Sequence, residues 1–392
     1  MQRTLSRNVP RDVDVLVIGG GQAGLAAGFY LNRLRRDEAS GRSGRAPTFT
    51  ILDASKDPGG AWQHYWPSLE LFSPAAYSSL PGYQMPARDG DGNPSAEHVT
   101  EYLRTYEARY DLPVHRAVTV GSVRVSADGY ITDTNQGQWT SRAVINATGN
   151  WGNPVIPQLP GGDLFAGQQL HTAGYRGPEA HAGQKVIVVG GGNSGAQIAA
   201  DLAPVATVTW VTRKPPRYLP DDVDGRALFQ IATRHTRALA AGEPSAGDVG
   251  SLGDIVAVPA VRAARDAGLL QARPMFSRFI SSGVQWENGE QQEADVVLWC
   301  TGFRPALQHL QPLGLTARNG VPATDAHLVT RSVDNTGLFF LGYGDWCGPA
   351  SATLIGVGAT ARDTVAAAAE RAAHAPSEIS SWDVQSELTR GL

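Results

Sequence analysis

The sequence predicts an α/β protein in which two similar strand–turn–helix units each carry a glycine-rich turn. In the first unit, the apolar run Val13–Ile18 leads into Gly19-x-Gly21-x-x-Gly24, and in the second, Lys185–Val189 leads into Gly190-x-Gly192-x-x-Gly195. Short apolar runs rich in β-branched residues are typical of strands buried on both faces of a parallel sheet. Glycines at this spacing let the pyrophosphate of a dinucleotide approach the helix N-terminus. The predicted fold class is therefore α/β, with two nested Rossmann-like dinucleotide-binding domains.

Each unit continues in the order that such a fold requires. After the first turn we expect a helix over Gln22–Arg35, a surface loop over Asp37–Pro47 and a strand over Phe49–Leu52. After the second we expect a helix over Asn193–Leu202 and a strand over Val208–Thr212. A strand, a crossover helix and a second parallel strand form one right-handed unit.

The other elements are predicted from shorter patterns. Pro58–Pro86 is crowded with Gly, Pro and aromatic residues and is predicted to be a long ordered loop, which in a compact domain is usually functional. The remaining predicted elements are a helix at Glu97–Tyr110, antiparallel strands within Val118–Ile131, strands at Ala143–Ala147, Asp295–Cys300 and Gly337–Leu341, helical patches near Gly225–Ala240 and Val258–Ala267, and a closing helix at Ala359–Ala373.

These elements divide the chain into three consecutive parts. Residues 1–165 are predicted to form the first part of one domain, residues 166–302 a second domain, and residues 303–392 the returning part of the first. Residues 214–274 are rich in Pro, Asp and Arg, and we interpret them as an insertion in the second domain. A chain of 392 residues is long enough to bury the cores of two such domains.

Composition narrows the class of protein and its surroundings. Hydrophobic residues make up 42% and charged residues 18% of the chain, as in soluble globular proteins. A net charge of −4 predicts neither a nucleic-acid surface nor a polybasic membrane patch. Two cysteines, Cys300 and Cys347, make no disulfide framework and no Cys-x-x-Cys pair, so a reducing cytoplasm is expected. We find no signal-peptide pattern and no apolar run long enough to span a membrane.

The end of the second strand in each unit distinguishes the two nucleotides. Asp53 can accept both hydroxyls of a ribose and would repel a 2′-phosphate, which favours FAD or NAD, and its place at the start of the fold favours FAD. Arg213 stands at the corresponding place in the second unit, with Lys214 and Arg217 close by. A guanidinium there suits the 2′-phosphate of NADPH, although these residues also fit a solvated basic loop.

Further segments are predicted to complete the FAD site. Gly344-Asp345 follows a predicted strand, and the carboxylate can hold a ribityl hydroxyl while the next helix points its N-terminus at the flavin. The loop with Gly59-Gly60-x-Trp62 and Leu71–Pro74 is predicted to lay an apolar wall beside the flavin ring. The residues predicted to bind cofactors are Gly19, Gly21, Gly24, Asp53, Gly60, Trp62, Thr148, Gly190, Gly192, Asn193, Ser194, Gly195, Arg213, Lys214, Thr301, Gly302, Gly344 and Asp345.

Several reactive residue types receive a structural interpretation instead. Thr148-Gly149 and Thr301-Gly302 are interpreted as hinge and wall elements at strand ends that border the cofactors, and not as catalytic residues. His171 is interpreted as a structural hydrogen-bonding residue, and Cys300 and Cys347 as packed thiols. Asp221-Asp222-x-Asp224 is interpreted as a solvated acidic loop, because no His or Cys accompanies it, and no metal site is predicted.

A third motif lies between the two glycine turns and carries a resemblance to a known family. Phe165-x-Gly167-x-x-x-His171-x-x-x-Tyr175-Arg176 resembles, at every fixed position, the pattern of class B flavin-containing monooxygenases. The resemblance covers most of residues 13–369 and implies the architecture shared with thioredoxin reductase. Within this family, the chain resembles the branch found in bacterial arsenic-resistance operons. The segments that carry this likeness are Gly59–Trp62, Leu71–Pro74, Gly344–Trp346 and Pro349–Ser351.

The resemblance implies an activity and its reactants. NADPH reduces bound FAD, dioxygen adds to give a flavin 4a-(hydro)peroxide, and one oxygen passes to a small soft nucleophile, for which an arsenical is one candidate. Trp62 and Ser73 are the predicted catalytic residues. Many members of the group carry Asn where this chain has Ser73, and Ser offers fewer hydrogen-bonding groups, which predicts release of hydrogen peroxide. A homodimer is compatible with such a chain.

Two other functions fit the same sequence. One is an NADPH:acceptor oxidoreductase, or a peroxide-forming NADPH oxidase, without a disulfide centre. The other is a flavin- and NADPH-binding sensor with no catalytic activity. The motif between the two glycine turns favours oxygen chemistry, and the absence of a Cys-x-x-Cys pair disfavours a disulfide substrate.

Overall fold

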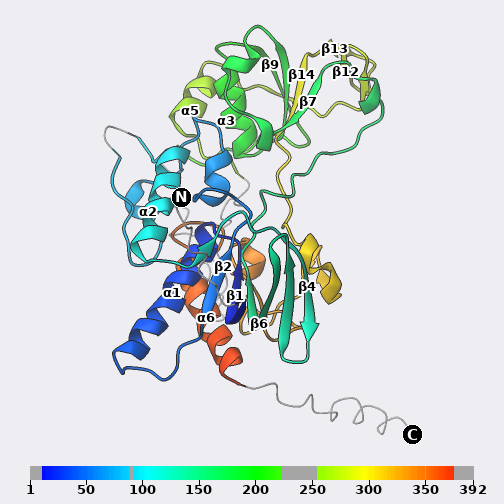
Figure 1. Ribbon diagram of the computed structural model, residues 1–392. Helices are drawn as coiled ribbons and strands as arrows, with labels where there is room; N and C mark the ends of the chain where they lie inside the picture. The colour runs from blue at the N-terminus through cyan, green and yellow to red at the C-terminus, as the bar shows by residue number, and fades with distance from the viewer. Residues whose placement is uncertain (1–10, 89–91, 222–253, 349, 375–392) are drawn as a thin grey trace, which may run out of the picture. The chain divides into compact units, whose positions relative to one another are not determined.

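Two compact units make up the chain (Figure 1). The computed structural model describes residues 11–88, 92–221, 254–348 and 350–374. Unit 1 comprises Met1–Pro58, Thr105–Thr148 and Leu307–Leu392, and unit 2 comprises Gly59–Arg104 and Gly149–Ala306. Residues 59–104, which the predicted boundaries assign to the first domain, thus pack in unit 2. The assignment of one nucleotide to each domain stays a prediction.

A seven-stranded mixed sheet forms the centre of unit 1. Its order is β3-β2-β1-β6-β5-β4, and β17 pairs with the second half of β6. The four strands β1, β2, β3 and β17 run parallel to their neighbours, whereas β4, β5 and the start of β6 form an antiparallel meander. The strands are β1 Asp12–Ile18, β2 Phe49–Leu52, β3 Val114–His115, β4 Val120–Ser126, β5 Gly129–Thr134, β6 Gly137–Asn146 and β17 Leu338–Phe340.

Helices α1 (Gln22–Ala39) and α6 (Val357–Ala373) pack beside each other against this sheet. Small buried residues along both helices permit that close approach, among them Ala23, Ala27 and Ala361. Helix α2 (Ala96–Arg109) begins in the residues of unit 2 and ends in those of unit 1. Shorter elements of unit 1 are the 3-10 turns η6 Gln308–Leu313 and η7 Asp345–Cys347 and the strands β15 Ala317–Arg318 and β16 Val321–Pro322.

A five-stranded parallel sheet forms the centre of unit 2, in the order β10-β9-β8-β14-β7. Its apolar strands β8 and β14 lie in the middle, and cores are packed on both faces. The elements are β7 Gln168–His171, β8 Lys185–Val189, β9 Thr207–Thr212, β10 Ala272–Pro274, β14 Val296–Trp299, α3 Asn193–Leu202, α5 Pro259–Asp266, the antiparallel β11 Arg278–Ile280, β12 Gly283–Gln285 and β13 Gln291–Glu293, and the 3-10 turns η1 Gly60–His64, η2 Ala75–Tyr77, η3 Gly162–Leu164, η4 Thr172–Gly174 and η5 Glu179–His181.

The predicted elements differ from the structure at several boundaries. Helix α1 continues four residues beyond Arg35, because Arg36, Glu38 and Ala39 are good helix formers, and it ends shortly before Gly41, which has a positive φ of 71°. Strand β7 was not predicted, because Gln168–His171 is a polar segment on a sheet edge. The end of the predicted insertion is β10, a strand of the sheet itself. The helical patch near Gly225–Ala240 lies outside the described residues.

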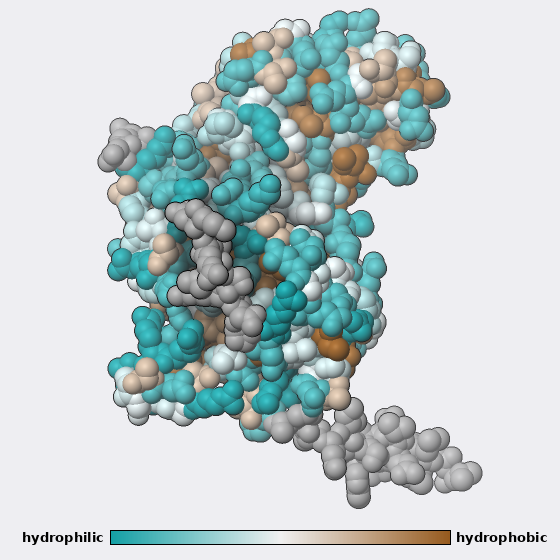
Figure 2. Space-filling model, in the orientation of Figure 1, coloured by the Kyte–Doolittle hydropathy of each residue, from teal (hydrophilic) through white to brown (hydrophobic). Residues whose placement is uncertain are grey.

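The surface is mixed in character. Hydrophilic residues predominate on the face shown in Figure 2, and hydrophobic residues form small groups there. The large exposed hydrophobic side chains include Val125, Ile156, Leu164 and Leu269. Among the described residues, no helix has the length and the apolar character that crossing a membrane requires.

Candidate functional site

The first glycine turn joins β1 to α1, and its close contacts require glycine. Gly19 has a φ of +108°, and a Cβ there would lie 2.3 Å from the carbonyl oxygen of Ala147. A Cβ on Gly24 would lie 1.8 Å from the carbonyl oxygen of Gly19. The turn therefore packs tightly against both the helix and the end of β6. Gly21 is the N-cap of α1, so the free amides of the first helical turn follow it directly.

Asp53 holds this turn from the end of β2. Its side chain is buried, with the residue 6% exposed. Oδ2 accepts a hydrogen bond from the Gly20 amide at 2.5 Å, and Oδ1 accepts one from the Ser55 amide at 2.7 Å. A carboxylate offers about four lone-pair sites, so acceptor capacity remains for the hydroxyls of a ribose. The residues around the first turn therefore fit the adenosine end of FAD.

An arginine that the sequence analysis missed completes this corner of unit 1. The Arg116 guanidinium lies between two carboxylates, forming an ion pair with Asp53 at 3.3 Å and a second with Glu107. Burial raises the pKa of Glu107, and the arginine opposes that effect. The arginine follows β3, and only the pairing of β3 with β2 brings it to Asp53.

A buried hydrogen-bond network fixes Thr148 at the end of β6. The Tyr343 hydroxyl accepts hydrogen bonds from Asn146 Nδ2 at 2.6 Å and from the Thr148 amide at 3.1 Å. With both acceptor positions filled, it donates to Thr148 Oγ1 at 2.7 Å. His309 Nε2 donates to Asn146 Oδ1 at 2.7 Å. A tyrosine between two glycines at a strand end was the available sequence signal for this network.

Gly344 and Asp345, which are predicted to bind the ribityl chain, follow Tyr343 directly and belong to unit 1. Gly344 has a φ of +95°, and its amide donates to Ser351 Oγ at 3.1 Å. Asp345 follows at the start of the short η7 turn. A loop separates Asp345 from α6, which begins at Val357, two residues before the predicted start of the closing helix. Cys347 is buried, and burial raises the pKa of its thiol, as expected for a packed side chain.

The second glycine turn repeats this construction between β8 and α3 in unit 2. A Cβ on Gly190 would lie 2.3 Å from the carbonyl oxygen of Cys300, and one on Gly195 would lie 2.1 Å from the carbonyl oxygen of Gly190. Gly192, the N-cap of α3, is not crowded as Gly190 and Gly195 are, because a Cβ there would meet no described atom within 4 Å. Open space beside the second glycine is what a pyrophosphate needs in order to approach.

The first two residues of α3 have different surroundings. The Asn193 side chain donates to the Asp254 carbonyl oxygen at 3.3 Å and accepts from the Val256 amide at 2.8 Å. Its amide group is thus used by the protein, and its main-chain N–H remains at the helix N-terminus. Ser194 is half-buried next to it.

The three cations after β9 are not equivalent. Arg213 and Lys214 are exposed, and neither forms an ion pair with any residue that the structure describes. The Arg217 guanidinium instead pairs with Asp254 at 2.8 Å. Of these three, Arg213 and Lys214 are therefore the cations without an ion-pair partner among the described residues.

The motif between the glycine turns connects three segments of unit 2. His171 Nδ1 accepts from the Ala173 amide at 3.1 Å, and Nε2 donates to the Gly302 carbonyl oxygen at 3.0 Å, so the histidine makes structural hydrogen bonds, as expected. Tyr175 donates to Asp201 of α3 at 2.7 Å, and Arg176 donates to the His64 carbonyl oxygen at 3.3 Å. Thr301, next to Gly302, donates to a neighbouring loop through its hydroxyl.

Half-buried aromatic side chains gather around this motif. We call Trp62, His64, Tyr65, Trp151 and Phe303 the aromatic cluster. The ring centroids of Tyr65 lie 5.4 Å from Trp62 and 4.7 Å from Trp151, and Trp151 stacks on Phe303 at 5.1 Å. Gly60, with a φ of +55°, starts the turn that carries Trp62 and His64. Of the residues predicted to form the wall, Trp62 belongs to this cluster, and the placement of the wall beside the flavin stays a prediction.

Ser73 lies in the same loop segment of unit 2 as Trp62. It is half-buried, and its carbonyl oxygen accepts from Ser78 Oγ at 3.3 Å, which closes a short turn. Among the described residues, the hydrogen bond of Ser73 uses its carbonyl oxygen and not its hydroxyl. The hydroxyl is therefore free to serve a ligand.

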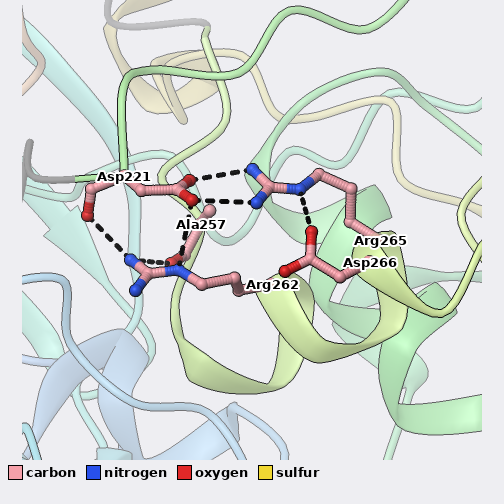
Figure 3. Close-up of polar contacts among 5 residues, drawn as sticks. All are labelled: Asp221, Ala257, Arg262, Arg265 and Asp266. Carbon is pink, nitrogen blue, oxygen red and sulfur yellow. Dashed lines mark hydrogen bonds and ion pairs between the residues drawn. The ribbon is translucent and has the colours of Figure 1, made fainter.

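Asp221 forms ion pairs with two arginines, Arg262 and Arg265 (Figure 3). Its carboxylate accepts two hydrogen bonds from Arg265, at 2.8 and 2.9 Å, and its carbonyl oxygen accepts one from Arg262 at 2.7 Å. Both arginines belong to α5, and Arg265 also bonds Asp266. Asp221 is exposed, as predicted for a solvated acidic loop, and these contacts fasten its segment to α5. Asp222 and Asp224 lie outside the described residues.

Comparison with known proteins agrees with this arrangement. The sequence profile described as "Pyridine nucleotide-disulphide oxidoreductase" matches residues 16–226, more than half of the chain. A flavin-containing monooxygenase from Stenotrophomonas maltophilia is 46% identical, with a TM-score of 0.79 over 91% of this chain and 97% of that one. The chain belongs to the flavin-containing monooxygenase family. It is an oxidoreductase, and its cofactors are FAD and NADPH.

More distant relatives of this monooxygenase have varied descriptions. An uncharacterised CzcO-like oxidoreductase from Geobacillus kaustophilus is 28% identical, over 89% of this chain and 96% of the relative. The probable indole-3-pyruvate monooxygenase YUCCA8 of Arabidopsis thaliana is 26% identical, over 84% of this chain and 83% of the relative. Bacillithiol disulfide reductase from Staphylococcus aureus shares the fold at 17% identity, with a TM-score of 0.67.

Proposed function

We propose that this monooxygenase transfers one oxygen atom of dioxygen to a small, uncharged, soft nucleophile, such as a thioether. The observation that carries the proposal is the aromatic cluster, in which five half-buried rings lie in contact within unit 2. Sulfur makes favourable contacts with aromatic rings, and a site lined by rings binds apolar molecules. None of the five side chains is a carboxylate, a guanidinium or an ammonium.

The proposed roles of the cofactor-binding residues follow from their surroundings. Asp53 and the amides after Gly21 would hold the adenosine and pyrophosphate of FAD. Gly192, Ser194, Arg213 and Lys214 would hold NADPH. When bound, the two cofactors supply the reduction and activation of dioxygen. On unit 2, the half-buried aromatic cluster would shield a bound substrate from water, and the Ser73 hydroxyl would donate a hydrogen bond.

The test is oxygen transfer itself. The purified protein with FAD and NADPH is given methyl phenyl sulfide under ¹⁸O₂, and the sulfoxide is analysed by mass spectrometry. We expect one ¹⁸O atom in the product and faster NADPH consumption than without sulfide. A charged amine of similar size serves as the comparison substrate and should react more slowly. Sulfoxide without ¹⁸O, or none at all, contradicts the proposal.

A second candidate function is a peroxide-forming NADPH oxidase, and the specific observation that favours it is Ser73. A single hydroxyl at this place offers fewer hydrogen-bonding groups than an amide side chain. NADPH consumption that appears entirely as hydrogen peroxide, with every sulfide tested, would favour this function. NADPH consumption only with an added acceptor would favour a reductase, and none under any condition would favour a sensor.

Three finer predictions have only the sequence in their support. An arsenical substrate is predicted from the likeness of a few segments to one branch of the family. None of the relatives named above is described as acting on arsenic. A location in the cytoplasm is predicted from composition, and a homodimer is compatible with the chain. Trivalent organoarsenicals can be added to the same ¹⁸O₂ assay, where a labelled pentavalent product would support that substrate.

A further inference from the structure

We propose that Asp254 limits the preference for NADPH by holding Arg217 away from the nucleotide. Arg213 and Lys214 are then left as the cations that meet the 2′-phosphate. The inference rests on the proposed placement of NADPH at the second glycine turn. It identifies an acidic residue, outside both glycine motifs, that sets the strength of cofactor discrimination.

Arg217 and Asp254 are in close contact, and one side chain is buried while the other is exposed. Arg217 Nη2 lies 2.8 Å from Asp254 Oδ1, and Nε donates to the same oxygen at 3.0 Å. The Asp254 side chain is 11% exposed, whereas that of Arg217 is 68% exposed. The carboxylate is therefore held in the protein, and the long arginine side chain reaches to it from the surface.

The ion pair lies beside the N-terminus of α3. Asn193, the first residue of that helix, donates to the Asp254 carbonyl oxygen and accepts from the Val256 amide. The same helix end faces the open space at Gly192. Arg217 follows Arg213 by only four positions, so a released guanidinium would remain near the phosphate-binding residues.

Main-chain contacts keep this region in place without the Asp254 carboxylate. The Ile255 amide donates to the Arg217 carbonyl oxygen at 2.8 Å, and the Leu219 amide donates to the Ile255 carbonyl oxygen at 2.9 Å. Asn193 bonds main-chain atoms only. The Asp221 cluster of Figure 3 fastens the same segment to α5. A substitution of Asp254 should therefore remove one charge and leave the fold intact.

The physical effect falls mainly on the 2′-phosphate. NADP⁺ carries that group and NAD⁺ does not, so an added nearby cation strengthens NADP⁺ binding more than NAD⁺ binding. An exposed charge pair contributes up to about a fivefold change in affinity. We therefore expect Asp254→Ala to raise the ratio of the NAD⁺ to the NADP⁺ dissociation constant by about twofold to fivefold.

The experiment is a double-mutant cycle on the FAD-loaded protein, with both dissociation constants measured by isothermal titration calorimetry. The variants are Asp254→Ala, Arg217→Ala and the double variant. The ratio should rise in the first variant and fall slightly in the second, which leaves the Asp254 carboxylate without its partner. It should return to the parent value in the double variant, because the gain requires Arg217. Asp254→Asn keeps the side-chain shape without the charge and should give a smaller rise.

The matched control removes a carboxylate of the same unit at the other end of the sheet. Glu293→Ala breaks the ion pair with Lys185, at the start of β8, whereas the glycine turn follows the end of β8. It should leave the ratio unchanged. An unchanged ratio in Asp254→Ala and Asp254→Asn, or a gain that survives in the double variant, overturns the proposal. Arg213→Ala and Lys214→Ala separately test the NADPH site, because failure of both to lower the ratio would contradict that placement instead.

Discussion

The Gly20 amide donates a hydrogen bond to Asp53 Oδ2 at 2.5 Å, which ties the first glycine turn to the end of β2. The contact leaves no room for a side chain, since a Cβ on Gly20 would lie 2.7 Å from the same oxygen. The turn that is proposed to receive the FAD pyrophosphate and the acid that is proposed to receive the ribose are thus one rigid piece. A fixed spacing between the two would favour binding of the ribose and the pyrophosphate together.

Asp53→Asn should weaken FAD binding by about tenfold to a hundredfold, as expected for loss of a hydrogen bond to a charged group. The amide oxygen can still accept from Gly20, so the turn should stay folded. The measurement is the flavin-to-protein ratio after dialysis, together with the recovery of free FAD fluorescence. Asp37→Asn, at a partly exposed acid of α1 paired with Arg42, is the control and should keep its flavin.

Arg213→Ala should lower the preference for NADPH over NADH by about tenfold to a hundredfold, because it removes a charge-assisted contact with the 2′-phosphate. Steady-state NADPH and NADH oxidation, compared as kcat/KM, measures this preference. Arg217→Ala is the matched control, since its guanidinium already pairs with Asp254. If Arg213→Ala leaves the preference unchanged, the phosphate contact belongs to Lys214 or the site lies elsewhere.

Ser73→Asn should lower the fraction of consumed NADPH that appears as hydrogen peroxide, and Ser73→Ala should raise it. An Asn side chain adds a second hydrogen-bonding group where a hydroxyl stands, whereas Ala removes the only one. Peroxide is measured with a peroxidase-coupled dye beside NADPH absorbance, without substrate. Equal peroxide release from both variants and the parent would show that Ser73 does not face the reacting oxygen.

His309 should make the fold sensitive to mild acid. Burial lowers the pKa of its imidazole from 6.5 to about 4 in the folded protein. The unfolded chain therefore takes up a proton near pH 6.5, and the folded protein does so only near pH 4. Its stabilising contribution is complete above pH 6.5 and is lost as the pH falls toward 4, by on the order of 3 kcal/mol.

Urea unfolding at pH 4.5, 5.5 and 7 measures this contribution. His309→Gln can still donate to Asn146 through its amide but has no imidazole to protonate. Its free energy of unfolding should therefore fall less between pH 7 and 4.5 than that of the parent. Parallel pH profiles of the two proteins would assign the acid sensitivity to other groups.

The sequence alone determined the parts of this protein whose cause is local. A β-branched run followed by three spaced glycines predicts a strand, a tight turn and a helix. Both dinucleotide units were therefore predicted with nearly the observed bounds. The aromatic loop was predicted from its composition. The cations Arg213 and Lys214 were predicted from their position after a strand. The family resemblance rested on a motif of contiguous residues for the same reason.

Only the tertiary structure decided which polar groups meet. Tyr343 reaches Asn146 and Thr148 because β17 pairs with β6, and Arg116 reaches Asp53 because β3 pairs with β2. It also separated Arg217 from Arg213, since the carboxylate that binds the former comes from a segment 37 positions further along the chain. Hydrogen bonds and ion pairs form only between groups a few ångströms apart. The separation of two residues in the sequence does not predict whether the fold brings them that close.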